Sequence, residues 1–361
     1  MILGLETSCD DTCAAVITPD GRILANVISS QGIHDRYGGV VPEVAARHHL
    51  ELMDAVTAAA LDRAGAGLDD ISLVAATQGP GLIGALLVGL AAGKAIAAGR
   101  GLPFAGVDHL HGHVAAAFLE PEPLEPPFVS LIASGGHTLL LRVESRTGEP
   151  EVLARTLDDA AGEAFDKGAR MLGLGYPGGA ALERLARGGD PKAFAFPSGR
   201  TADFSFAGLK TALLYKLRDL AADDLPGDAD AAAARDHARR ANGRAARDEA
   251  GADRAPGLGD QLRADLAASF QEAIVRAIVG RVEVALEQTG LERLAVGGGV
   301  AANGPLRERL AGLGVRVSLP PGELCTDNAA MIASAGRYVR ALPYPDYLGV
   351  EAYATGEGPL R

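Results

Sequence analysis

Three of the eight histidines lie within five residues, at His109, His111 and His113. If this segment is helical, His109 and His113 are one turn apart on the same face, and two imidazoles at that spacing can bind one metal ion. His111 is about 200° away around such a helix and points elsewhere. The alternative interpretation is a polar helix start whose histidines bind nothing. Spacing alone does not name a third ligand, and the zinc-protease motif His-Glu-x-x-His is absent.

Three glycine turns adjoin predicted strands, at Ser134–Gly136, Gly178–Gly179 and Gly297–Gly299. Without a Cβ, the backbone N–H groups of such turns can approach a phosphate closely. Each turn on its own is equally compatible with an ordinary tight connection. No Gly-x4-Gly-Lys-Ser/Thr motif occurs, which excludes a P-loop. The three turns together predict a nucleotide site of another kind.

Four carboxylates stand where they could bind a ligand or accept a proton. Asp10 and Asp11 lie in the first predicted hairpin turn. Asp166 lies beside Lys167 in a predicted helix, and Asp327 lies directly before another helix. An aspartate before a helix is often only an N-cap, and an Asp–Lys pair on a helix is often a surface pair. The residue types alone leave these roles open.

Hydrophobic periodicity and turn residues divide the chain into two runs of elements with the same order. In the first run, strands are expected at 2–6, 13–18, 22–28, 71–77 and 104–107, and helices at 42–64, at 82–100 and from 109. In the second run, strands are expected at 128–133, 137–143, 151–156, 293–296 and 315–318, and helices from 158, at 304–312 and at 327–341. Such a repeat is typical of actin-like, Hsp70-like and sugar-kinase-like proteins. We therefore expect an α/β fold with two lobes around a nucleotide cleft, each lobe having a mixed five-stranded sheet flanked by helices.

The expected lobe boundaries follow from this repeat. Lobe I comprises 1–126 and 328–361, and lobe II comprises 127–327. Within lobe II, the stretch 221–258 is rich in Ala, Asp and Arg and nearly free of large apolar residues, so it cannot bury a core of its own. We expect a low-complexity insertion there that is dispensable for folding, and a helix whose apolar spacing resumes at Leu262.

Composition excludes several classes of protein. No apolar run reaches the roughly 18 residues that a membrane span needs, and Met1–Gly4 lacks the basic residues of a signal peptide. The three cysteines, Cys9, Cys13 and Cys325, are too few for a disulfide framework and suit a reducing cytoplasm. The formal net charge of −12 argues against binding nucleic acid by electrostatics alone.

Nine longer motifs are spread along the chain. They are Gly4–Thr12 (GLETSCDDT), Tyr37–Glu43 (YGGVVPE), Gly79–Gly89 (GPGLIGALLVG), Ser134–Thr138 (SGGHT), Asp158–Lys167 (DDAAGEAFDK), Tyr176–Gly179 (YPGG), Asp203–Thr211 (DFSFAGLKT), Gly297–Asn303 (GGGVAAN) and Cys325–Asn328 (CTDN). In order and spacing they resemble the TsaD family, formerly called glycoproteases, over nearly all of 1–341 apart from the insertion. The resemblance implies an actin-like fold. It also implies transfer of the threonylcarbamoyl group from threonylcarbamoyl-AMP to N6 of adenosine 37 in tRNAs reading ANN codons, with release of AMP.

Carried over position by position, the resemblance implies a set of site residues. The metal ligands are His109, His113 and Asp327, with iron(II) as the expected ion and zinc as the alternative. The donor contacts are Ile132, Ala133, Ser134, Gly135, Gly136, Asp166, Gly179, Glu183 and Asn303. Two positions depart from the family, since Glu183 stands where Asp is frequent and His111 stands where Glu is common. No general base is assigned, and Asp10 and Asp11 are the candidates.

The resemblance also implies partners. The family acts on tRNA in the cytoplasm and not at a membrane. In bacteria it acts together with the paralogous TsaB subunit and the TsaE ATPase. Small residues such as Gly84, Ala85 and Gly89 in the expected helix 82–100 would let a helix of the paralogue approach closely, although they suit packing inside the lobe equally well.

Two other functions remain open. One is an ATP-dependent small-molecule kinase of the same fold. The histidine pair argues against it, because kinases hold Mg²⁺ through carboxylates and phosphates. The other is a non-catalytic scaffold subunit, and the intact set of His109, His113 and Asp327 argues against that.

Overall fold

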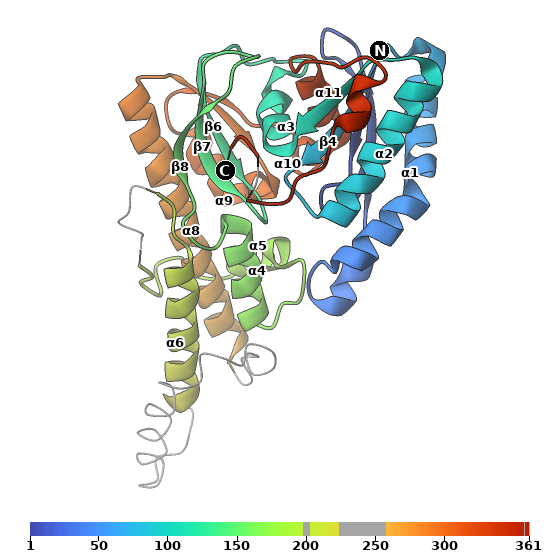
Figure 1. Ribbon diagram of the computed structural model, residues 1–361. Helices are drawn as coiled ribbons and strands as arrows, with labels where there is room; N and C mark the ends of the chain where they lie inside the picture. Colours follow the sequence, from blue (N-terminus) through green and yellow to red (C-terminus); the bar gives the residue numbers. More distant parts are fainter. Residues whose placement is uncertain (198–202, 224–257, 357, 361) are drawn as a thin grey trace.

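The computed structural model describes residues 1–197, 203–223, 258–356 and 358–360, and two β-sheets lie at its centre (Figure 1). The first sheet contains β1 (Ile2–Glu6), β2 (Asp11–Ile17), β3 (Ile23–Ser30), β4 (Leu73–Gly79) and β5 (Phe104–Asp108), in the order β3-β2-β1-β4-β5. β2 runs antiparallel to β1 and β3, whereas β4 runs parallel to β1 and β5 parallel to β4.

The second sheet repeats this pattern. It contains β6 (Phe128–Ala133), β7 (Thr138–Val143), β8 (Glu151–Arg155), β9 (Arg293–Gly297) and β10 (Arg316–Ser318), in the order β10-β9-β6-β7-β8. β7 is antiparallel to β6 and β8, β9 is parallel to β6, and β10 is parallel to β9. The prediction of two mixed five-stranded sheets is therefore confirmed. The lobe boundaries stay a prediction.

Helices cover both faces of the first sheet, which is why β1 is buried on both sides. Leu3 and Leu5 pack with α1 (Pro42–Ala64) and α2 (Ile83–Arg100). On the other face, Ile2 packs with α11 (Ala329–Gly336). α2 is long and apolar enough to cross a membrane, with a mean hydropathy of 1.4, but it packs against α1 and β4 as a helix of this layer.

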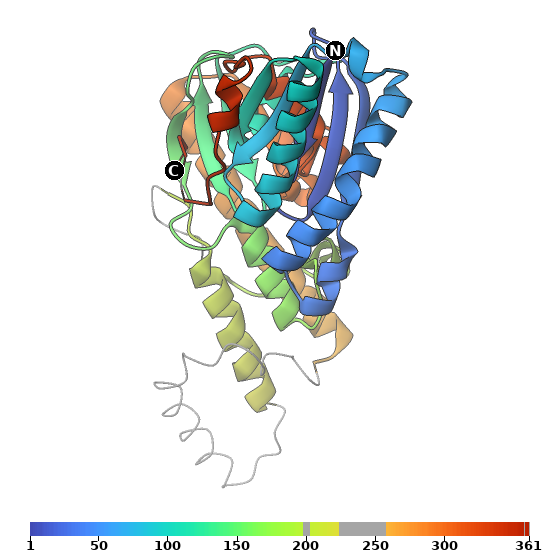
Figure 2. The same cartoon turned by 45° about the vertical axis from the view of Figure 1, so that its right-hand side comes forward.

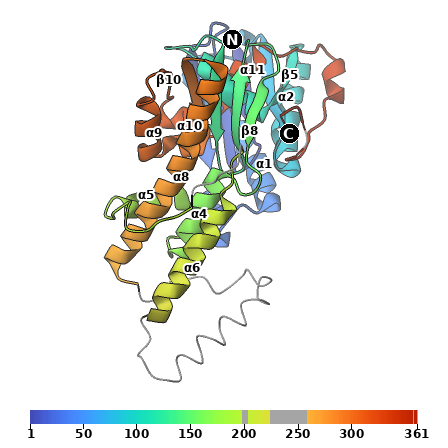
Figure 3. The same ribbon diagram turned by 90° about the vertical axis from the view of Figure 1, so that its left-hand side faces the viewer.

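The second sheet carries a larger helical layer. α4 (Ala161–Met171), α5 (Gly178–Ala186), α6 (Ala207–Asp223) and the long α8 (Asp260–Thr289) share one apolar core with its strands (Figure 3). α9 (Gly304–Ala311) contacts α8. α8 begins two residues before Leu262, as the apolar spacing predicts. The predicted insertion 221–258 falls almost wholly on 224–257, which lie outside the described residues.

A short helix lies at each of the two places where the chain crosses from one sheet to the other (Figure 1 and Figure 2). α3 (His109–Ala115) leads from β5 to β6. The segment 319–328, with α10 (Gly322–Cys325), leads from β10 to α11. α3 and α11 contact each other directly. The two crossings therefore meet in the middle of the molecule.

Two helix boundaries differ from expectation. The helix expected from 158 begins at Ala161, because the Asp158 carboxylate instead accepts hydrogen bonds from Phe206 N (2.7 Å) and Ala207 N (3.2 Å) at the start of α6. The helix expected at 327–341 ends at Gly336. Beyond it, Leu342 exchanges backbone hydrogen bonds of 2.8 and 3.0 Å with Phe104, which extends the edge of β5.

Candidate metal centre and cleft

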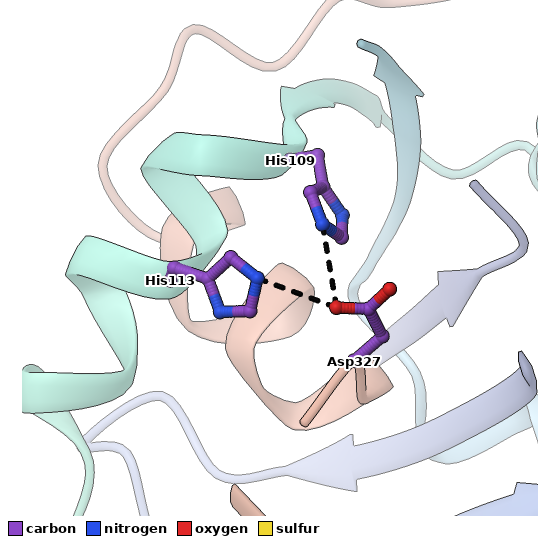
Figure 4. A group of neighbouring side chains, drawn as sticks. All are labelled: His109, His113 and Asp327. Atoms are coloured by element: carbon purple, nitrogen blue, oxygen red, sulfur yellow. Dashed lines mark ion pairs between the residues drawn. The ribbon is translucent and has the colours of Figure 1, made fainter. Parts of the chain in front are cut away.

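The predicted histidine pair projects from one face of α3 toward Asp327 (Figure 4). Asp108 caps this helix, because its Oδ1 accepts hydrogen bonds from Leu110 N (2.9 Å) and His111 N (3.0 Å). The cap starts the helix at His109. From there His109 Nε2 lies 3.4 Å and His113 Nε2 lies 3.3 Å from Asp327 Oδ1. One ligand atom from each of the three residues lies within 4.8 Å of the others.

Asp327 is not an N-cap, so that alternative interpretation is wrong. The cap of α11 is Asn328, whose Oδ1 accepts a hydrogen bond from Met331 N at 3.0 Å. The Asp327 carboxylate is thereby left to face the histidines. Burial opposes its charge, but His109 and His113 hold the pKa of this carboxyl well below its usual value.

The donor set and its bonding fit a divalent transition metal. His113 Nδ1 and Nε2 are both buried without a hydrogen-bond partner among the described residues, because the 3.3 Å approach to Asp327 lacks hydrogen-bond geometry. A buried polar atom without a partner costs free energy unless a ligand uses its lone pair. Two imidazoles and one carboxylate form a set that suits zinc and is also that of non-haem iron(II) sites.

Glu6, which the sequence did not indicate as a site residue, contacts the ring nitrogen of His109 that does not face Asp327. Its Oε2 lies 2.9 Å from His109 Nδ1 and accepts a hydrogen bond of 2.6 Å from Thr77 Oγ1. Burial disfavours charge on both partners, yet Asp327 and Glu6 raise the pKa of His109 well above its usual value, and His109 lowers the pKa of Glu6. The one signal in the sequence is a carboxylate at the end of an otherwise apolar buried strand.

His111 faces away from the centre, as its position on the helix predicts. Its Nδ1 lies 3.2 Å from Asp108 Oδ1, and its Nε2 lies 3.1 Å from Glu149 Oε2. The imidazole thus joins the end of β5 to the connection between β7 and β8. Burial opposes its protonation, but the two carboxylates raise its pKa.

A cleft of about 530 Å³ opens beside the metal residues. Among its lining residues are His109, Asp327, Asp10, Asp11, Ser134, Gly135, Gly136, His137, Asp166 and Tyr176. Asp166 is held in place because its Oδ1 accepts a hydrogen bond of 2.8 Å from Gly178 N. Burial raises the pKa of Asp11 to about 7. Arg170 Nη2 of α4 donates to Gly38 O at 2.7 Å and so joins α4 to the segment that follows β3.

The other predicted donor contacts are not among the residues that line this cleft. Asn303 Nδ2 donates to Glu183 Oε2 (3.2 Å) and to Gln271 Oε1 (2.9 Å), and Asn303 also caps α9. Glu183 and Gln271 line a separate hollow of about 490 Å³. Gly179 lies in the first turn of α5, beside the amide that binds Asp166. Ile132 and Ala133 have fully buried side chains, so only their backbone atoms can meet a ligand.

The fold and the site define an actin-like protein with a two-histidine, one-carboxylate centre in its interlobe cleft. Among solved structures, HypF of T. kodakarensis superposes with a TM-score of 0.57 at 15% identity, covering 93% of this chain and 47% of that one. Full-length HypF in its phosphate- and nucleotide-bound form gives a TM-score of 0.52 at 13% identity, covering 93% of this chain and 54% of that one. At these identities the likeness confirms the fold alone.

The family follows from closer relatives. Residues 22–334 match the family described as TsaD, tRNA N6-adenosine threonylcarbamoyltransferase. A protein of that description from Symbiobacterium thermophilum is 48% identical over 347 residues, covering 94% of this chain and 91% of its own length. Another from Pelobacter propionicus is 45% identical over 364 residues, covering 98% and 96%. The chain belongs to the TsaD family.

Proposed function

We propose that the chain transfers the threonylcarbamoyl group from threonylcarbamoyl-AMP to N6 of adenosine 37 in tRNAs that read ANN codons. The observation that carries the proposal is the cleft, where His109 and Asp327 lie beside the glycine turn Ser134–Gly136. That pairing provides a metal position next to backbone amides suited to a phosphate. Membership of the family and the names of its relatives support the same activity.

The reaction forms one bond to the carbamoyl carbon, breaks another bond to that carbon, and removes one proton from N6. N6 of the adenosine attacks the carbamoyl carbon, the bond from that carbon to the phosphate oxygen breaks, AMP leaves, and N6 loses a proton. A phosphate is a good leaving group, so the attack of a poor amine nucleophile is the harder part, and holding both reactants in place lowers its barrier. The predicted donor contacts Ser134–Gly136, Asp166, Gly179, Glu183 and Asn303 would hold the AMP half.

The N6 proton needs an acceptor in the cleft. Asp10 and Asp11 remain the candidates from the sequence, and both line the cleft. A carboxylate whose pKa is raised by burial toward the working pH makes an effective base. Asp11, with a pKa of about 7, meets that condition.

His109, His113 and Asp327 would hold one divalent metal ion, iron(II) in our proposal and zinc as the alternative. Bound there, such an ion supplies charge stabilisation and a binding point for the carboxylate and hydroxyl of the threonyl group. The protein's own part is to keep two imidazoles and a carboxylate converging on one point with little solvent.

We also propose cytoplasmic action together with a TsaB-like paralogue and a TsaE-like ATPase. At a net charge of −12, the chain repels a polyanion at long range. α1 exposes Leu50, and α2, which packs against α1, exposes Ile83 and Leu87, and we propose this surface for the paralogue. We expect weak tRNA binding by the chain alone and tight binding with its partners, measured by titration at physiological salt. Tight, salt-sensitive binding by the isolated chain would refute the charge argument.

The activity is tested by AMP release from threonylcarbamoyl-AMP in the presence of unmodified tRNA and the partners. The expected result is one AMP and one modified adenosine for each donor consumed, with both lost when His109 and His113 are replaced by alanine. Turnover of ATP on a small hydroxylated substrate instead would favour the kinase. Undiminished modification by the double variant would favour the scaffold.

A further inference from the structure

Glu6 is a buried carboxylate that is not among the predicted site residues. It ends β1 and is 1% exposed. Oε1 accepts a hydrogen bond from Ser8 N, and Oε2 accepts one of 2.6 Å from Thr77 Oγ1 on β4. Oε2 also lies 2.9 Å from His109 Nδ1. Both oxygens are thus in use, and two strands of the first sheet fix where the carboxylate points.

These bonds determine which nitrogen of His109 carries a proton. An ionised carboxylate only accepts hydrogen bonds, so its contact with His109 requires a proton on Nδ1. In the neutral imidazole, Nε2 then has the free lone pair. Nε2 is the atom that lies 3.4 Å from Asp327 Oδ1, on the side where the ligand atoms converge.

We propose that Glu6 is a positioning residue of the metal centre, which holds His109 in the tautomer and ring orientation that offers Nε2 to the ion. A metal-bound histidine whose other nitrogen donates to a carboxylate is oriented and made more basic. His113 has no such partner among the described residues, so the two histidines are unequal ligands. This inference rests on the proposed function only through metal binding at these residues.

Replacing Glu6 by the isosteric glutamine tests the bond without removing volume. If the amide oxygen faces His109 and Thr77, the NH₂ group meets the Ser8 N–H, and two donors oppose each other. If the NH₂ group faces His109, it opposes the Nδ1–H and favours a proton on Nε2, which blocks that ligand. The metal-binding tautomer of His109 therefore exists only in the first orientation, which carries the opposed donors. Thr77→Val is the matched control, because it removes one bond to Glu6 and leaves the Glu6–His109 contact.

The measurement is the affinity of the full chain for zinc alone, by competition with a chelator, beside the thermal midpoint of the metal-free protein. We expect Glu6→Gln to weaken zinc binding about 10- to 100-fold, as outer-shell partners typically do. Thr77→Val should weaken it less than about tenfold. In zinc-loaded wild type, NMR should show a slowly exchanging Nδ1–H of His109.

The outcomes separate this inference from the metal assignment. Wild-type protein that binds no zinc at His109, His113 and Asp327 would count against the proposed metal site itself. Wild type that binds zinc while folded Glu6→Gln binds it equally well would overturn the role of Glu6, and so would an equal loss in Thr77→Val. If Glu6→Gln does not fold, the wild-type spectrum decides, since a His109 ring protonated at Nε2 or bound through Nδ1 contradicts the proposal.

Discussion

Gly4→Ala tests how closely the sheet holds the helix that follows Asp327. Gly4 is the middle residue of β1, paired with Ala15 on β2 and Ala75 on β4. A Cβ at this position would lie 2.3 Å from Ala329 O and 2.9 Å from the Cβ of Ala333, both on α11. Because Cβ contacts below 3.0 Å essentially never occur, β1 and α11 must move apart by about 0.7 Å or more at this point. Asp327 lies two residues before that helix and moves with it.

The cost is that of overpacking a tight core, about 1–3 kcal/mol. With about 2.1 cal/mol/K of unfolding entropy per residue, a chain of 361 residues loses about 1.3 °C per kcal/mol. The expected fall in the thermal midpoint of the metal-free protein is therefore about 1–4 °C, together with weaker zinc binding. Gly99→Ala is the control, since Gly99 lies in α2 with nothing within 4 Å of its would-be Cβ.

Gly99→Ala should leave the thermal midpoint unchanged or raise it, because alanine stabilises a helix by up to about 1 kcal/mol relative to glycine. Differential scanning calorimetry gives both midpoints, and chelator competition gives the zinc affinity. A Gly4→Ala protein with the midpoint and zinc affinity of wild type would show that α11 is not held against β1 as described.

Two further predictions concern the site. Replacing His109 and His113 by alanine should remove bound metal from folded protein, measured by elemental analysis, whereas His111→Ala, which faces Asp108 and Glu149, should retain it. Burial raises the pKa of Asp11 to about 7, so the folded metal-free protein keeps a proton there that the unfolded chain releases near pH 4. Stability from this group therefore falls as pH rises from about 4 to about 7. In Asp11→Asn, the thermal midpoint of the metal-free protein should fall less between about pH 4 and about pH 7 than in wild type. An equal fall in the two proteins would contradict the raised pKa of Asp11.

The strands and helices were largely predictable because the central strands of both sheets are buried on both faces and because proline and glycine mark the ends of elements. α1 begins at Pro42, where a missing N–H costs least, and ends before Gly65 in a left-handed conformation. The shared face of His109 and His113 followed from helical spacing. These features are local, and local spacing can be inferred without knowing how distant segments meet.

Contacts between distant segments could not be predicted from spacing. Glu6 and His109 are 103 residues apart, and nothing in either neighbourhood indicates that they meet. Asp327 was indistinguishable from an N-cap until Asn328 proved to be the cap. Asn303 donates to Glu183 on α5 and to Gln271 on α8, and its spacing from them in the sequence indicates neither contact. Only the packing of the layers determines such pairs.

Both segments that join the two sheets carry metal residues, and this arrangement constrains how the molecule can open. If the two sheets rotate as rigid bodies, displacement grows with distance from the segments that join them. Those segments carry His109, His113 and Asp327, so the three residues would lie close to the rotation axis and move least. The hydrogen bond from Arg170 of α4 to Gly38, which follows β3, would be among those that break. Labels on the two sheets should then change their separation on ligand binding while the absorption spectrum of a bound cobalt(II) ion stays constant. With the three residues on the rotation axis, the cleft would open to a ligand while the distances among His109, His113 and Asp327 stay constant.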